Sequence, residues 1–211
     1  MIEAYLATLA GVALAQASPG PNMLAVAGAA LGSGRRAALW TVAGIATAML
    51  VWAAAVAVGL AAILELYPPV LTTMKLVGGA YLLWLAVKGL RAAIRGEGVA
   101  VTARASAHGA WRSWRNGLAV VLTNPKAALM WTAVGTYLFG SGLTAVEVAL
   151  FGPIGAVSAL LVYGGYALAF STGAASRVYG RFSRAINAGI GGAFGLLGGS
   201  LVADALLGRR T

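Results

Sequence analysis

Two short polar segments interrupt long apolar stretches of this chain, and their residue types could bind an anion. The first, inside an apolar run from about residue 2 to residue 31, consists of Ser18, Pro19, Gly20, Pro21 and Asn22. The second, inside a run from about residue 118 to residue 137, consists of Thr123, Asn124, Pro125 and Lys126. In both, a residue that often caps helices precedes a proline, which is typical of the start of a helix. Because a helix start presents backbone N–H groups and about half a positive charge, two such starts would favour a carboxylate.

Both segments are predicted to lie near the middle of a membrane. At about 1.5 Å per helical residue, Pro21 is about 21 Å from Arg35, and Pro125 is about 15 Å from Arg115. The hydrocarbon core of a bilayer is about 30 Å thick, so both distances end close to its centre. A helix that starts there leaves backbone groups without water, and transporters use such broken helices to hold charged substrates.

Three side chains of these segments are given roles. Ser18 is expected to cap a helix that begins at Pro19, and Asn124 to cap one that begins at Pro125. Lys126 is costly at this depth, by about 3 kcal/mol on insertion scales, and is a candidate for holding a carboxylate or changing its protonation state. The alternatives are that the prolines only kink the helices and that the lysine snorkels to the inner surface. Two matching breaks and a lysine so deep favour a substrate site.

The composition is that of a polytopic membrane protein. Apolar residues make up 60% of the chain and charged residues only 9%, whereas a soluble domain carries about 25% charge. Apolar runs long enough to cross a bilayer recur along the chain. We predict an all-α protein with six transmembrane helices, at about residues 3–31, 38–64, 70–92, 116–139, 145–170 and 186–207.

The net charge of +10 is distributed as in a membrane protein rather than a nucleic-acid-binding one. Basic residues fall in the first, third and fifth connections: Arg35, Arg36, Lys88, Arg91, Arg95, Arg104, Arg112, Arg115, Arg177, Arg181 and Arg184. Acidic residues fall near the other side: Glu3, Glu65, Glu147 and Asp204. The positive-inside rule then places both termini outside the cytoplasm. The basic side is also expected to attract anionic membrane lipid.

The chain is predicted to be one transporter domain, residues 1–211, built from two inverted repeats. Residues 1–95 and 111–211 each contain a proline break followed by a glycine pair, and residues 96–110 form a cytoplasmic linker. Each half has three predicted spans, an odd number, so the second half must be upside down relative to the first. Substrates bind where such halves meet.

Metal and cofactor chemistry is not expected. There is no cysteine, and the only histidine, His108, falls in the linker. Since no carboxylate is predicted near the middle of the membrane, the sequence leaves open whether a proton or sodium is the coupling ion and which residue binds it. A homo-oligomer is left open as well.

The two proline segments, together with the run from Lys75 to Leu82 and with Ile186-Asn187 before the glycine-rich last span, resemble the LysE/RhtB family of bacterial amino-acid exporters. The resemblance covers nearly the whole chain. It implies a small carrier of the bacterial plasma (inner) membrane that exports amino acids or close derivatives, driven by an ion gradient. The substrate-binding residues it implies are Ser18, Pro19, Gly20, Pro21, Asn22, Asn124, Pro125 and Lys126. The scarcity of polar groups in the spans favours a neutral or apolar amino acid.

Other functions are retained as alternatives. An exporter of another small solute is one, although a metal or cation exporter should need clustered carboxylates, His or Cys. A membrane enzyme is disfavoured because the chain has no His-Glu-x-x-His element and no cysteine nucleophile. A membrane scaffold would make both proline breaks simple kinks.

Overall fold

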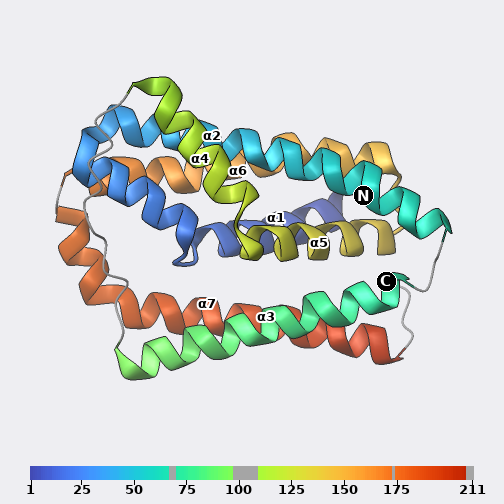
Figure 1. The fold of residues 1–211 in the computed structure, drawn as a ribbon. Helices are drawn as coiled ribbons and strands as arrows, with labels where there is room; N and C mark the ends of the chain where they lie inside the picture. Colours follow the sequence, from blue (N-terminus) through green and yellow to red (C-terminus); the bar gives the residue numbers. More distant parts are fainter. Residues whose placement is uncertain (67–69, 97–108, 173, 208–211) are drawn as a thin grey trace.

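The computed structural model describes residues 1–66, 70–96, 109–172 and 174–207, and within these residues it contains helices and no strand. The helices are α1 (Ile2–Ala17), α2 (Pro21–Leu66), α3 (Val70–Arg95), α4 (Ala110–Leu122), α5 (Pro125–Gly140), α6 (Ala145–Phe170) and α7 (Ala174–Leu207) (Figure 1). The predicted all-α class is therefore confirmed. Most of the predicted linker, and the Pro68-Pro69 pair between the second and third predicted spans, lie outside the described residues.

Two glycines in the left-handed region reverse the chain. Gly34 has a φ of 82° inside α2, and Gly142 has a φ of 81° in the turn after α5. Only glycine adopts this conformation without strain. Figure 1 shows α2 folding back on itself, and Gly34 is the residue at which its helical geometry is interrupted. Each half of the chain thus contains a helix, a break, a second helix, a glycine turn and a long helix, in that order.

The first and fourth predicted spans are broken into two helices, α1–α2 and α4–α5. The second break has the expected form, because Asn124 caps α5 and Pro125 is its first residue. The first does not: α2 begins at Pro21 rather than Pro19, and Ser18 ends α1 instead of capping α2. The reason is that a residue before proline avoids the helical region, so Gly20, which precedes Pro21, would interrupt a helix that began at Pro19.

Helices α2 and α4 cross at two glycines that let the backbones touch. A Cβ atom on Gly44 would lie 2.0 Å from the carbonyl oxygen of Trp114, and one on Gly117 would lie 2.0 Å from that of Thr41. Close approach at small residues is a common way to pack helices in membranes, where apolar burial gives little driving force between them.

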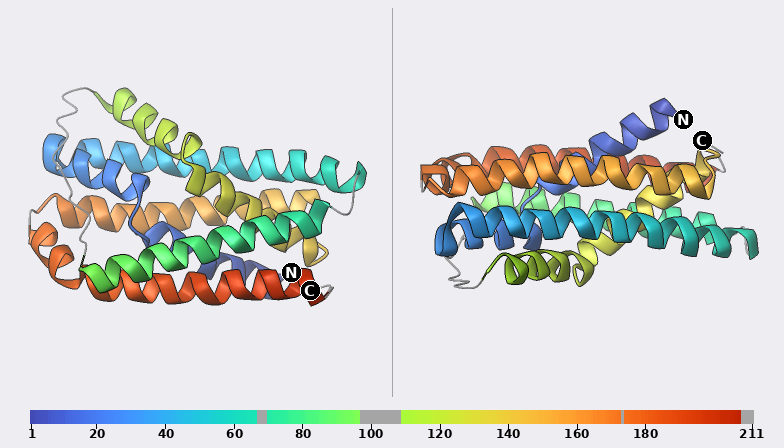
Figure 2. Two further views of the ribbon diagram at one scale, coloured as in Figure 1. Left: turned by 60° about the horizontal axis from the view of Figure 1, so that its bottom comes forward. Right: turned by 90° about the horizontal axis from the view of Figure 1, so that it is seen from above.

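Helices α3 and α7 form a pair along one side of the molecule, apart from the bundle of the other helices (Figures 1 and 2). Glycines again line the contact: a Cβ on Gly198 would lie 2.8 Å from the carbonyl oxygen of Gly79. The two helices come from opposite halves of the chain, so this pair joins the halves at a second place.

The exterior suits a lipid environment. In the described residues, two stretches are long and apolar enough to cross a membrane, Pro21–Gly59 and Ala145–Phe170, with mean hydropathies of 2.1 and 2.0. Core helices of soluble proteins can be equally apolar, so exposure is the more useful observation. Large apolar side chains are exposed on several helices, including Leu161 at 72% and Leu196 at 79%. Extensive apolar exposure of this kind is typical of a surface that contacts membrane or protein.

The glycine contact between α2 and α4 gives a first prediction. Gly117→Ala should lower the free energy of unfolding by about 1–3 kcal/mol, because its new methyl group would overlap the Thr41 carbonyl. The measurement is the Tm of the detergent-purified protein. Gly164→Ala is the control, since a Cβ there has no neighbour within 4 Å, and it should leave the Tm unchanged or raise it slightly. Equal Tm values for the two variants would contradict the close helix contact.

Candidate functional site

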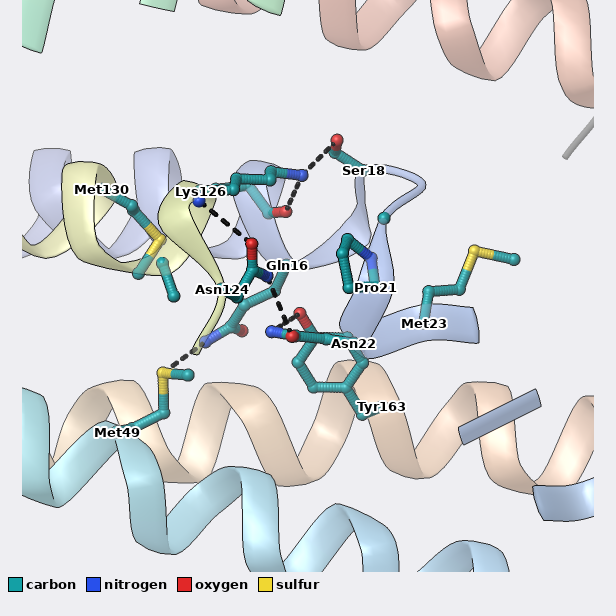
Figure 3. Close-up of a pocket in the computed structure, with 13 residues that line it drawn as sticks. Gln16, Ser18, Pro21, Asn22, Met23, Met49, Asn124, Lys126, Met130 and Tyr163 are labelled. Carbon is teal, nitrogen blue, oxygen red and sulfur yellow. Dashed lines mark hydrogen bonds between the residues drawn. The ribbon is translucent and has the colours of Figure 1, made fainter. Parts of the chain in front are cut away.

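The two helix breaks meet through a chain of buried hydrogen bonds (Figure 3). The side-chain amide of Asn124 donates to the side-chain oxygen Oδ1 of Asn22 at 3.1 Å, although the two residues are 102 positions apart in the sequence. The Asn22 amide in turn donates to the hydroxyl of Tyr163 on α6 at 3.2 Å. Both asparagines are buried. The residues predicted from the two separate segments therefore form one site.

The start of α5 is already capped by the protein. The Asn124 carboxamide oxygen accepts from the backbone N–H of Lys126 at 3.0 Å. Its backbone carbonyl accepts from Ala127 and Ala128 at 2.9 and 3.1 Å. The expectation that the start of α5 presents unpaired backbone N–H groups is thus wrong, because Asn124 accepts from Lys126, Ala127 and Ala128. The start of α5 still presents the positive end of the helix dipole, because capping does not cancel the dipoles of the aligned peptide units in the helix.

Lys126 connects the second break to the first. Its ammonium group donates to the Ser18 hydroxyl at 2.6 Å and to the carbonyl oxygen of Ala15 at 3.1 Å. It also lies 5.9 Å from the centre of the Phe194 ring. A cation is favoured at this position because Ala15 is in the last turn of α1, the negative end of that helix. Within the described part of the chain no carboxylate pairs with this lysine, so its charge is not neutralised by the protein.

A second buried polar group fixes the end of α1 against α6. Gln16 donates to the carbonyl oxygen of Gly155 at 3.2 Å and accepts from the Ser158 hydroxyl at 2.8 Å. Close by, the hydroxyl of Tyr166 donates to the carbonyl oxygen of Ala17 at 2.7 Å. These contacts hold the C-terminal end of α1 in place beneath Lys126.

The sequence analysis missed Gln16, Ser158 and Tyr163. Each is a single polar residue inside an apolar stretch, and that is the signal that could have identified them, since a buried polar group in lipid needs a partner. Neither the spacing nor the residue types would have identified the partners themselves.

The polar side chains surround a cavity of about 20 Å³, which is room for about one water molecule. Its lining includes six of the eight predicted substrate-binding residues: Ser18, Gly20, Pro21, Asn22, Asn124 and Lys126. Pro19 is half-buried in the first break and does not line the cavity, while Pro125 begins α5. The other lining residues are Ala15, Gln16, Met23, Met49, Ala127, Met130 and Tyr163. In this structure the cavity is therefore too small for an amino acid.

Comparison with known proteins identifies the family. Residues 13–205 match the sequence model of the LysE type translocators. The chain belongs to this family. It is accordingly a helical membrane protein, and its family is one of translocators rather than enzymes.

Several relatives are similar to parts or most of the chain. The threonine efflux protein of Escherichia coli K12 is 32% identical over 127 residues, or 60% of this chain and 62% of that protein. The threonine efflux protein of Salmonella typhi is 31% identical over 129 residues, 61% and 63% of the two chains. The matches therefore span less than two thirds of these relatives. The uncharacterized membrane protein YahN of E. coli K12 is 28% identical over 194 residues, 91% of this chain and 86% of YahN. No solved structure is significantly similar to the chain.

The capping role of Asn124 gives a second prediction. Asn124→Ala should lower the free energy of unfolding by about 0.5–2 kcal/mol, because α5 loses its cap. Asn124→Ser keeps a capping oxygen but loses the amide donor to Asn22, so its loss should be smaller. Thermal unfolding of both variants in detergent measures the difference. If the two variants unfolded at the same temperature, the Asn124 side chain would not be stabilising the helix start.

Proposed function

We propose that this protein is a secondary transporter that exports amino acids across the bacterial inner membrane, with the substrate bound between the two helix breaks. The observation that carries the proposal is Lys126: among the described residues its ammonium group donates to two neutral oxygens, and it lines the same cavity as Asn22 and Asn124. Membership of the translocator family and similarity to threonine efflux proteins support amino-acid export in general.

The polar groups suit both charges of a zwitterion. A substrate carboxylate would accept from the Lys126 ammonium, with the positive end of α5 adding to the attraction. The substrate ammonium would take the two acceptors that Lys126 uses in the closed site, the Ser18 hydroxyl and the Ala15 carbonyl. These acceptors lie at the negative end of α1, which favours a cation. The carboxylate is therefore held mainly by the lysine and helix dipole, and less by free N–H groups.

The proposed mechanism is alternating access by two inverted repeats of three spans each. A cavity of about 20 Å³ has to widen, first toward one side of the membrane and then toward the other, to pass an amino acid. Movement of residues 1–95 relative to residues 111–211 about their shared contacts would do this. An ion gradient, of protons or sodium, would supply the energy for export.

The proposed orientation places both termini outside the cytoplasm. The Gly34 turn, the end of α3 and the starts of α4 and α7 lie at one end of the molecule, and the start of α1 and the end of α7 at the other (Figure 1). The segments at the first end carry Arg35, Arg36, Arg91, Arg95 and Arg112. Under the positive-inside rule this basic end is cytoplasmic.

Reporter fusions test the orientation. Alkaline phosphatase fused to the C-terminus should be active, and green fluorescent protein fused at the same position should be dark. This combination reports that the C-terminus lies in the periplasm. A fusion after Arg36 should give the opposite pattern and serves as the control. A fluorescent C-terminal fusion would contradict the proposed orientation, because the C-terminus would then lie in the cytoplasm.

Export itself is tested in cells preloaded with dipeptides, whose hydrolysis supplies many amino acids at once. Lys126→Ala should reduce release of the exported amino acids to the level of cells lacking the protein, while the amount in the membrane stays normal. Arg36→Ala is the control: that arginine is exposed and lines neither of the two cavities, and its loss should leave export intact. Normal release by the Lys126 variant would remove the central residue of the proposed site.

A further inference from the structure

A second and much larger cavity lies among α1, α3, α5 and α7. Its volume is about 260 Å³, and most of its lining is apolar. The lining residues are Ala7, Thr8, Gly11, Val12, Ala15, Leu82, Met130, Ala133, Val134, Tyr137, Phe194 and Ser200. They come from the bundle on one side and from the α3–α7 pair on the other.

The large cavity begins where the polar site ends. Ala15 and Met130 line both cavities. Phe194 lines the large cavity, and its ring is also the one that faces the Lys126 ammonium at 5.9 Å. A molecule whose charged end is bound at Lys126 therefore has an apolar space next to it, bordered on the side of the polar site by Ala15, Met130 and Phe194.

We propose that this cavity receives the side chain of the transported amino acid and selects large apolar side chains. The inference rests on the proposed function, since it assigns the charged end of the same substrate to Lys126. The polar site has room for about one water molecule and cannot hold a side chain. The large cavity can, because an apolar cavity of about 150 Å³ is already enough for benzene.

The lining favours leucine, methionine or phenylalanine over threonine. An additional methylene buried in a hydrophobic pocket typically discriminates between substrates by about 10–200-fold. Only three of the twelve lining residues carry a hydroxyl, Thr8, Tyr137 and Ser200, and that of Thr8 already donates to the Ala4 carbonyl at 2.7 Å. This chain should therefore differ in preference from the relatives named for threonine efflux.

The test changes the volume of the cavity and measures a ratio of two substrates. Ala133 is half-buried and lines only the large cavity, so Ala133→Phe should fill part of it. In cells preloaded with Ala-Leu, we expect this variant to lower the ratio of leucine to alanine efflux by about tenfold or more. Met130→Ala, which enlarges the passage between the cavities, should raise the ratio of phenylalanine to alanine efflux.

The matched control is Ala10→Phe, the same substitution on α1 at an exposed position that lines neither cavity. It should keep the wild-type ratio. If Ala133→Phe does not reach the membrane, Val134→Ala provides the test from the other direction, with an expected rise in phenylalanine relative to alanine.

The outcomes separate the two proposals. A wild-type protein that releases no amino acid at all would refute the proposed function before any ratio is measured. If the wild type exports amino acids but every variant keeps its ratio, the cavity holds something else, such as a lipid acyl chain, and the side-chain assignment is wrong. If Ala133→Phe lowered leucine and alanine efflux by the same factor, the side-chain assignment would be wrong too, because the cavity would then be a path that all substrates share.

Discussion

The structure depends on one constraint: a helix broken inside lipid must find partners for its polar groups within the protein. This chain has two breaks that the sequence predicts to lie inside lipid, and each supplies hydrogen-bond partners to the other. Asn22 and Asn124 bond to one another, and Lys126 from the second break bonds to Ser18 at the first. Because the breaks belong to different halves of the chain, satisfying them also fixes how the halves meet.

Sequence alone predicted the features that follow from local rules. The all-α class, the positions of both breaks, the Asn124 cap and the turn at Gly142 each depend on a few neighbouring residues. The error at the first break is also local: with prolines at both 19 and 21, the sequence offers two possible helix starts. The structure resolves the choice in favour of Pro21, since the Gly20 carbonyl accepts the first hydrogen bond of α2, from Leu24.

Contacts across the chain could not be predicted in the same way. Nothing near Asn22 in the sequence points to Tyr163, and Gln16 gives no sign that its partners are Gly155 and Ser158. The pairing of α3 with α7 depends on glycines such as Gly198, which are too frequent in this chain to identify a contact by themselves. These features become visible only when both halves are placed together.

The same hydrogen-bond acceptors explain how the proposed site could be stable both empty and occupied. When it is closed, Lys126 occupies the Ser18 hydroxyl and the Ala15 carbonyl. A bound zwitterion would bring its own ammonium to those acceptors and its carboxylate to the lysine, so each charged group exchanges one partner for another. An exchange of this kind keeps each charged group hydrogen-bonded in both states, whereas a buried charge without any partner would cost several kcal/mol. A transporter needs such a balance, because a site that strongly preferred one state would stop the cycle there.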